Sequence, residues 1–253
     1  MYFMNNPIGI LSLPLSFIGV LDDKLNISRK VRYIAQLTSV ALIYFYSKGF
    51  FQSLQVENEI IQIFLIIFVV FLGTAIINFT NFMDGLDGLI SGTMIIWFIA
   101  ISISWNISFL ILVGALVGFI IWNWSPAKIF MGDSGSTFLG CVVVGVIFNI
   151  KSLTQLINSL LILSPIFFDS ISCIFLRLKY KQNIFEPHKK HLYQRLYIAG
   201  WSKELVAFLY MSNTTFLALA YLKSQFLLYI ATFLTIIFGI VLNERKAYNF
   251  KNQ

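Results

Sequence analysis

Long apolar stretches separated by short polar ones make up most of this chain. Nine of them reach or approach the roughly 20 residues that a helix needs to cross a bilayer. They cover residues 5–21, 31–47, 60–79, 88–105, 107–124, 136–150, 154–176, 204–222 and 225–243. The first and sixth are short for a crossing, and Pro7 and Pro14 weaken the first as a helix. The pattern predicts an all-α, polytopic membrane protein with about nine transmembrane helices.

Composition agrees with this class. Hydrophobic residues make up 58% of the 253 residues and charged residues 11%, against roughly a quarter charged in soluble domains. No internal repeat, low-complexity linker or soluble domain interrupts the pattern, and no Lys or Arg precedes Lys24 to form the basic start of a secretory signal. We therefore predict a single integral-membrane domain over residues 1–253.

Basic residues are distributed unevenly between the two sets of alternate loops. Fifteen of the 18 Lys and Arg lie on the loops after the first, third, fifth, seventh and ninth runs, and the opposite loops carry only Lys48, Lys151 and Lys223. By the positive-inside rule, the richer set faces the cytoplasm. The net charge of +7 then lies on one membrane face, where it attracts anionic headgroups and substrates. Nucleic acid is not needed as a partner.

Five of the six aspartates fall on the loops predicted to be cytoplasmic. Asp22 and Asp23 are adjacent, so their charges repel unless they share a cation or a proton. Two solvated acids beside a basic run are the alternative. Asp84 and Asp87 are three apart and share a face if a helix has begun there. Asn81 precedes Asp84 by three residues, and a capped polar turn is the alternative for this stretch.

Asp133 lies in a run of small residues, Gly132 to Ser136, just before another apolar helix. Small residues let backbone N–H groups approach phosphate oxygens, and a helix N-terminus favours anions. A carboxylate beside such an anion site indicates a metal between the two, although a simple helix cap is the alternative. Asp169 is different, because it lies inside the seventh run, where a functional acid and a structural acid are both open.

The two histidines and the two cysteines do not form a pattern of metal ligands in the sequence. His188 and His191 are three apart in a basic loop, a spacing compatible with zinc, but the loop offers no further His or Cys. Cys141 and Cys173 lie inside apolar runs without companion ligands, so neither a disulfide framework nor a zinc site is indicated. Phosphate binding explains the histidines best, and contact with lipid headgroups is the alternative for this loop.

Together these groups suit one type of chemistry. Acids, carboxamides, a Gly/Ser anion loop and a His/Lys/Arg loop, all on one membrane face, fit metal-assisted phosphoryl transfer on a cytosolic diphosphate with a membrane-embedded co-substrate. Because the candidate ligands are oxygen-rich, Mg²⁺ is the expected ion.

Four motifs, taken in order, resemble those of the polyprenyl-phosphate N-acetylhexosamine-1-phosphate transferases, a family that includes the phospho-N-acetylmuramoyl-pentapeptide transferase of cell-wall synthesis. The motifs are Gly19 to Asp23, Asn78 to Leu89, Pro126 to Gly135 and the His188/His191 loop. The resemblance covers residues 10 to 200. It implies transfer of N-acetylhexosamine-1-phosphate from a UDP-N-acetylhexosamine to polyprenyl (undecaprenyl) phosphate, with release of UMP, at the cytoplasmic face of the inner membrane.

The resemblance also implies roles for individual residues. Asp22 and Asp23 lie next to the lipid phosphate, one of them as a base. Asp133 is the principal Mg²⁺ ligand and Asn81 the second, while Asp84 and Asp87 belong to the metal and nucleotide region. The residues placed in the substrate site are Asn78, Asn81, Asn123, Phe130, His188 and His191, with Asn123 and Phe130 near the uridine and the histidines near the diphosphate. Phe130 has an ordinary lipid-facing role as its alternative.

Several alternatives remain open from the sequence. The chain is expected to be short of helices that relatives place before the Asp-Asp pair, so an inactive relative that only binds UDP-sugar or polyprenyl lipid is one alternative, and a transporter using Asp169 is another. The His-Lys-Lys-His pattern resembles the branch that initiates surface polysaccharides and O-antigen. The identity of the hexosamine is open, as is the oligomeric state, for which a homodimer is one option.

Overall fold

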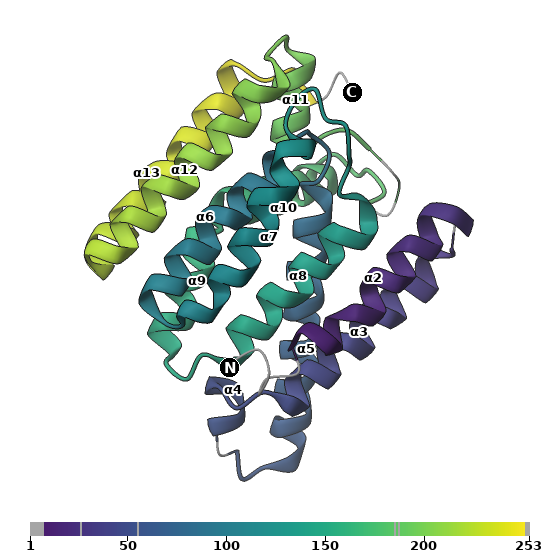
Figure 1. The fold of residues 1–253 in the computed structure, drawn as a ribbon, viewed down its shortest axis with the longest axis vertical. Coiled ribbons are helices and arrows are strands. Elements are labelled where there is room, and N and C mark those ends of the chain that lie inside the picture. The colour runs from purple at the N-terminus through teal and green to yellow at the C-terminus, as the bar shows by residue number, and fades with distance from the viewer. Residues whose placement is uncertain (1–7, 26, 55, 185, 187, 251–253) are drawn as a thin grey trace. The chain divides into compact units, whose positions relative to one another are not determined.

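The computed structural model describes residues 8–25, 27–54, 56–184, 186 and 188–250, with the side chain of Asp23 outside the described part. Every regular element in this part is a helix (Figure 1), which confirms the all-α prediction. Residues 5–7 of the first predicted run lie outside the described residues.

The chain divides into two compact units. Unit 1 comprises Met1–Asn81 and Met131–Ser159, and unit 2 comprises Phe82–Phe130 and Leu160–Gln253. Unit 1 contains α2 (Ile8–Leu25), α3 (Arg29–Tyr46), α4 (Phe50–Ser53), α5 (Glu59–Phe82, whose last residue belongs to unit 2) and α8 (Gly132–Asn149). Unit 2 contains α6 (Leu89–Ser104), η1 (Ile107–Phe109), α7 (Leu110–Asn123), α10 (Ser164–Lys179), α11 (Leu192–Ile198), α12 (Lys203–Lys223) and α13 (Gln225–Arg245). Helix α9 (Leu153–Ile162) passes from unit 1 into unit 2.

Unit 1 is built around α8. This helix packs against α2 and α3, which lie side by side (Figure 1). The α8 residues Val142, Val143 and Val144 are fully buried, so α8 is apolar on all sides because neighbours surround it. At Gly19, α2 comes so close to α8 that an added Cβ would lie 2.5 Å from the backbone nitrogen of Ser134.

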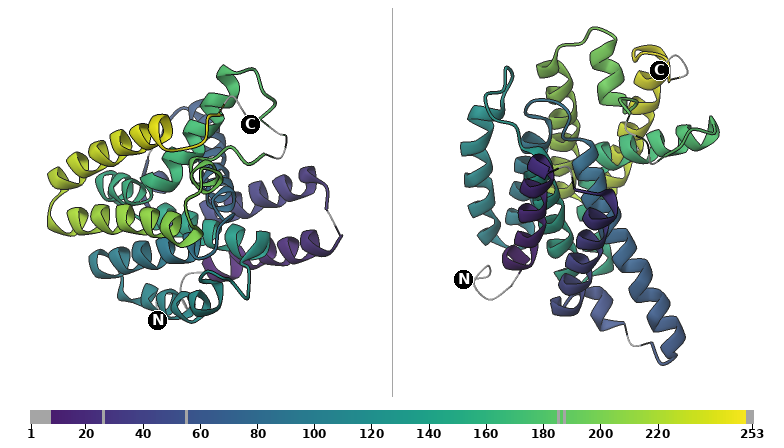
Figure 2. Two further views of the ribbon diagram at one scale, coloured as in Figure 1. Left: turned by 90° about the horizontal axis from the view of Figure 1, so that it is seen from above. Right: turned by 90° about the vertical axis from the view of Figure 1, so that its right-hand side faces the viewer.

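Unit 2 is held together by α6 and α12. Helix α6 packs against α7 and α12, and α12 pairs with α13. The helices α12 and α13 lie side by side in Figures 1 and 2. Trp97 and Phe98 of α6 are fully buried in this unit. Large buried aromatic side chains of this kind contribute much of the apolar contact in a core.

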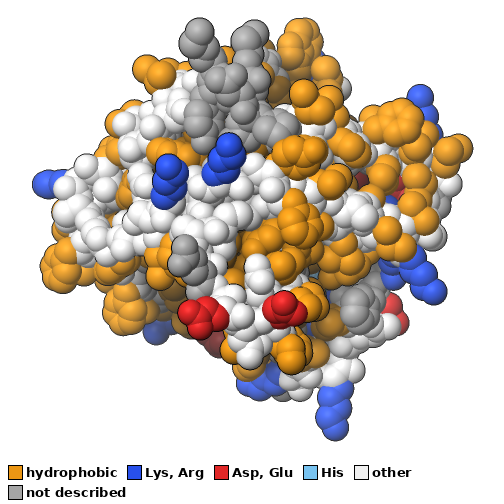
Figure 3. All heavy atoms as spheres, turned by 90° about the horizontal axis from the view of Figure 1, so that it is seen from below, with side chains coloured by type: hydrophobic (Ala, Val, Ile, Leu, Met, Phe, Trp, Pro, Cys, Tyr) orange, Lys and Arg blue, Asp and Glu red, His pale blue; other side chains and the backbone are white. Residues whose placement is uncertain are grey.

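Large apolar side chains also cover the outside of several helices. Ile60, Phe64 and Phe68 of α5, and Phe226 and Phe233 of α13, are all exposed, and hydrophobic side chains spread over the face shown in Figure 3. In a soluble protein, apolar exposure on this scale would be unfavourable. These surfaces therefore suit contact with lipid.

The number of membrane spans is not confirmed at nine. Among the described residues, four helices are long and apolar enough to cross a membrane (α5, α8, α12 and α13), and α9 with α10 makes a fifth if the bent pair counts as one span. Helix α6 has only 16 residues, about 24 Å at 1.5 Å per residue, against a hydrocarbon core of roughly 30 Å. Helices of this length are therefore shorter than the hydrocarbon core that a full crossing has to span.

The seventh predicted run is two helices, not one. Helices α9 and α10 meet at a bend of 76° around Leu163. Pro165 stands in the first turn of α10, where a proline is tolerated because its missing N–H needs no partner there, whereas inside a continuous helix it would break a hydrogen bond. The bend has a local cause that the apolar pattern alone did not show.

The close approach at Gly19 gives a stability prediction. Gly19→Ala should lower the unfolding free energy by about 1–3 kcal/mol, because the new methyl group collides with backbone and the helices must separate. Gly114→Ala is the matched control, since a Cβ at Gly114 meets nothing within 4 Å and alanine favours a helix. Thermal unfolding in detergent measures both. Equal melting temperatures for the two variants would contradict the close packing of α2 on α8.

Candidate functional site

Two carboxylates from separate segments of unit 1 converge on one guanidinium. Asp22 lies in the last turn of α2, and Asp133 lies in the first turn of α8. One terminal nitrogen of Arg32, in the first turn of α3, contacts the Oδ2 atoms of both acids. Without a cation between them, the two carboxylates would repel each other. The cluster is therefore a place in unit 1 where a positive charge is held.

Asn81 adds a carboxamide to this cluster. Its Nδ2 donates to Oδ1 of Asp133 at 3.0 Å and to Oγ of Ser136 at 2.9 Å. The amide oxygen of Asn81 is then the atom left for a cation. Gly132 to Ser136 form the start of α8 itself, so the helix begins earlier than the predicted residue 136. Asp133 consequently lies at the positive end of the helix dipole, where a carboxylate is favoured.

Asn78 and Asp23 are the other predicted site residues of unit 1, and they are close in sequence to Asn81 and Asp22. Asn78, one turn before Asn81 on α5, donates to Oε1 of Gln36 and to the carbonyl of Thr74, both at 2.8 Å. It therefore links α5 to α3, and its contact with substrate stays a prediction. Asp23, the second member of the acidic pair, has its side chain outside the described part.

Asp87 is a buried link within unit 2. Its Oδ2 accepts from the backbone N–H of Ala127 at 3.1 Å and lies 3.2 Å from Nζ of Lys203. Buried charges are generally paired in this way. The carboxylate connects the loop after α7 to the start of α12, so part of its coordination capacity is already used inside unit 2.

Asn123, buried at the end of α7, uses both sides of its amide. Its Oδ1 accepts from the N–H of Gly88 at 3.1 Å and from the hydroxyl of Ser91 at 2.8 Å, and its Nδ2 donates to the carbonyl of Ile129 at 3.0 Å. These bonds hold the loop after α7 against the start of α6. Phe130, at the end of that loop, is 70% exposed. The uridine contacts of both residues stay predictions.

The Asp84 loop packs against Tyr193 of α11. The Tyr193 hydroxyl donates to the carbonyl of Phe82 at 3.0 Å, and a Cβ on Gly85 would collide with this hydroxyl, so the position requires glycine. Burial raises the pKa of the Tyr193 hydroxyl, and the charges of Asp169 and Asp84 add to the effect. The hydroxyl therefore remains a hydrogen-bond donor at neutral pH. No pattern in the sequence indicates this link.

Asp169 holds the start of α11, directly after the histidine loop. It is 1% exposed and accepts from the N–H groups of Leu192 at 2.7 Å and Tyr193 at 3.0 Å, and from the hydroxyl of Tyr210 at 2.6 Å. Its Oδ1 also lies 3.3 Å from Nδ1 of His191. A buried carboxylate with this many donors is well satisfied. Asp169 therefore has the structural role that was one of its two alternatives from the sequence, since it holds the start of α11.

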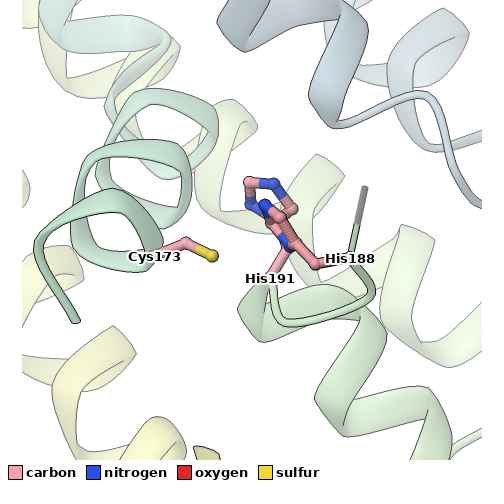
Figure 4. Close-up of side chains that lie close together, drawn as sticks. All are labelled: Cys173, His188 and His191. Atoms are coloured by element: carbon pink, nitrogen blue, oxygen red, sulfur yellow. The ribbon is translucent and has the colours of Figure 1, made fainter. Parts of the chain in front are cut away.

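His188 and His191 are stacked, with ring centroids 5.1 Å apart. His191 is nearly fully buried and His188 is partly buried. Cys173 of α10 joins them: the three possible ligand atoms all lie within 4.8 Å of one another (Figure 4). This corrects the expectation that neither cysteine has companion ligands, because the chain turns back after α10 and brings both histidines to the thiol.

The predicted site residues therefore fall into two groups. Unit 1 brings Asp22, Asn81 and Asp133 together around Arg32 and places Asn78 one helical turn away. Unit 2 contains Asp84, Asp87, Asn123, Phe130, His188 and His191. Of these, His188 and His191 are in direct ring contact.

Comparison with known protein families identifies the chain's relatives. A sequence model of glycosyl transferase family 4 matches residues 7–152, more than half of the chain, and this span contains all five acids predicted for the site. The chain belongs to glycosyl transferase family 4. The recognition made from the four motifs is confirmed, although the histidine loop lies beyond the span that the family model matches.

Individual relatives in this family are bacterial proteins. The chain is 31% identical to the probable undecaprenyl-phosphate N-acetylglucosaminyl 1-phosphate transferase of Bacillus subtilis, over 74% of this chain and 57% of the relative. It is 34% identical to the phospho-N-acetylmuramoyl-pentapeptide-transferase of Bacillus licheniformis, over 74% and 64%. It is 30% identical to the undecaprenyl-phosphate alpha-N-acetylglucosaminyl 1-phosphate transferase of Thermotoga maritima, over 74% and 60%.

The chain thus spans between 57 and 64% of the length of these relatives. Its long apolar helices and its relationship to this family identify it as a multi-pass membrane protein.

The contacts of Asp169 give a prediction for the histidine loop. Asp169→Ala leaves the amides of Leu192 and Tyr193 and the Tyr210 hydroxyl without their acceptor, at about 1–3 kcal/mol for each buried group. Hydrogen–deuterium exchange of the peptide 188–198 should therefore become faster. Tyr210→Phe is the control, because it keeps both amide bonds to Asp169 and should retain most of the protection. Unchanged exchange in Asp169→Ala would show that the carboxylate does not hold this segment.

Proposed function

We propose that the protein transfers N-acetylhexosamine 1-phosphate from a UDP-sugar to polyprenyl phosphate, undecaprenyl phosphate in bacteria, and releases UMP. The observation that carries the proposal is the convergence of Asp22, Asn81 and Asp133 within the segment matched by the family. The names of the relatives support it, since they describe transferases of sugar 1-phosphates to undecaprenyl phosphate. The product would initiate a lipid-linked surface polysaccharide, at the cytoplasmic face of the inner membrane.

Mg²⁺ is the ion that we expect this cluster to hold. Asp133, Asn81 and Asp22 supply only oxygen ligands, the donor set that Mg²⁺ prefers, and the contact of Arg32 with both carboxylates supports room for a positive charge there. When bound, Mg²⁺ supplies positive charge that offsets the charge of a diphosphate and of the departing UMP.

Arg32 has a second part in this proposal. The guanidinium contacts carboxylate oxygens of Asp22 and Asp133, so a divalent cation held by these acids would compete with it. An Arg32 side chain released from the acids is a strong partner for a phosphate group, because its donors match phosphate oxygens. We assign it to the phosphate of the lipid acceptor.

The transfer itself requires one bond to form and one to break. An oxygen of the lipid phosphate forms a bond to the phosphorus that carries the sugar, and the bond from that phosphorus to the UMP oxygen breaks, so UMP leaves with the electron pair. The member of the Asp22/Asp23 pair that is not bound to the metal accepts the remaining proton of the lipid phosphate and keeps the attacking oxygen anionic. In unit 2, we assign His188 and His191 to the diphosphate, Asn123 and Phe130 to the uridine, and Asp84 and Asp87 to the region around the nucleotide.

The proposal is tested by UMP release from UDP-N-acetylhexosamines, using purified full-length protein with undecaprenyl phosphate and Mg²⁺. Asp133→Asn should reduce release roughly 100-fold or more, because a lost metal ligand costs several kcal/mol of charge stabilisation. Glu57→Gln is the control, since this exposed acid lies between α4 and α5 and away from the cluster. Thermal unfolding checks that both variants remain folded.

Two results would overturn the assignment. One is full activity of a folded Asp133→Asn variant. The other is UMP release by the wild-type protein that persists without any lipid phosphate, since this would indicate hydrolysis of the UDP-sugar and not transfer.

A further inference from the structure

A second group of possible metal ligands lies in unit 2, and its chemistry differs from that of the acidic cluster. It consists of the Cys173 sulfur and one ring nitrogen each of His188 and His191, all within 4.8 Å of one another. In Figure 4 the thiol points from its helix toward the two stacked rings. One thiol and two imidazoles are the ligands of borderline and soft transition metals, whereas Mg²⁺ prefers oxygen.

Two of the three side chains in this group are buried, and charges of both signs lie around them: Asp169 on one side, and Arg177, Arg195 and Lys190 as basic neighbours of Cys173. Cys173 is 2% exposed and His191 is 4% exposed. Within the described part of the chain, Nδ1 of the buried His191 makes no well-directed hydrogen bond, but it lies within ion-pair distance of the Asp169 carboxylate. The carboxylate of Asp169 is 3.3 Å from this nitrogen, so negative charge stands directly beside the ligands. A Cys173 thiolate and Asp169 together would balance a charge of +2.

We propose that Cys173, His188 and His191 form a binding site for a thiophilic divalent cation of the zinc class. Three protein ligands leave a fourth position open in a tetrahedral site. Ligand atoms in such a site lie roughly 3.3–3.6 Å apart, given Zn–N of about 2.0–2.1 Å and Zn–S of about 2.3 Å. The three side chains therefore have to close by up to about 1.2–1.5 Å from their present limit of 4.8 Å, which side-chain rotation can supply.

His188 is the ligand with the most freedom to adjust, since it lies on a loop and is partly buried. The N–H of Lys190 donates to its Nδ1 at 3.2 Å, so coordination through Nδ1 replaces one hydrogen bond. His188 lies on the loop before α11 and is only partly buried, which gives an ion a route to the site. Cys173 and His191 are set by helix α10 and by the start of α11, so they form the more rigid part.

The site has a consequence for transfer that rests on the proposed function. Both histidines assigned to the diphosphate are ligands here, so an ion bound to them would withdraw them from the UDP-sugar. Zinc would then act as an inhibitor at this site, while Mg²⁺ acts at the separate oxygen cluster of unit 1. Loss of Cys173 should relieve the inhibition without removing either histidine.

Cobalt titration of the purified full-length protein tests the site without reference to activity. Co²⁺ replaces Zn²⁺ in such sites, and a thiolate ligand gives a charge-transfer absorption in the near ultraviolet. The wild type and Cys141→Ser should show this absorption, and Zn²⁺ should abolish it by displacement. Cys173→Ser should lack it. Cys141→Ser is the matched control because Cys141 is also a buried cysteine inside a helix.

A second variant, His188→Asn, tests the same site from the loop. His188→Asn, on the loop, should weaken Co²⁺ binding by at least the roughly 10- to 100-fold that even an outer-shell partner contributes, and it serves if Cys173→Ser does not fold. No absorption in the wild type, or equal absorption in Cys173→Ser, overturns the site.

UMP release is then measured with Zn²⁺: inhibition of the wild type but not of Cys173→Ser supports the regulatory consequence. If no variant releases UMP, the proposed function fails and the cobalt spectrum still decides the site.

Discussion

The contact of Arg32 with both Asp22 and Asp133 is the interaction on which the account of unit 1 depends. It requires three helices to meet at their ends: α2 brings one acid, α8 the other, and α3 the guanidinium. Two carboxylates this close need a cation, and an exposed ion pair by itself contributes little to stability. Because this cluster contributes little to stability, Arg32 can be replaced between the two acids by another cation at little cost.

Unit 2 depends on a different kind of constraint, the burial of a fully bonded carboxylate. Asp169 accepts hydrogen bonds from two backbone amides and a tyrosine hydroxyl, so it fixes where the chain enters α11. The same helix presents Tyr193 to the Asp84 loop. Each unit thus positions its polar residues by a separate network, and the chain passes between the units after Asn81, after Phe130 and after Ser159.

Much of the fold class and the family could be predicted from the sequence, because both depend on local patterns: apolar runs predict helices, and four short motifs identify the family. The bend at Leu163 was missed, since the proline in the first turn of α10 does not change the mean hydropathy of the run, and the nine predicted spans are not confirmed by the lengths of the described helices. Arg32 was missed as a partner of Asp133 because the two residues are 101 positions apart in the sequence. Cys173 was judged to have no companions because no local pattern shows that the loop after α10 turns back onto that helix. The catalytic, substrate-binding and metal-binding roles of all the predicted site residues stay predictions.

Binding of Mn²⁺, in place of Mg²⁺, to Arg32→Gln and to the wild type, followed by electron paramagnetic resonance, tests the central claim most directly. Removal of the guanidinium should tighten binding roughly 2- to 30-fold, because two partly exposed ion pairs of about 0.2–1 kcal/mol each no longer have to be broken. Lys30→Gln removes the same charge from the same turn of α3 and should change the affinity less. If Arg32→Gln binds Mn²⁺ no more tightly than Lys30→Gln, the carboxylates that hold Arg32 are not the cation site.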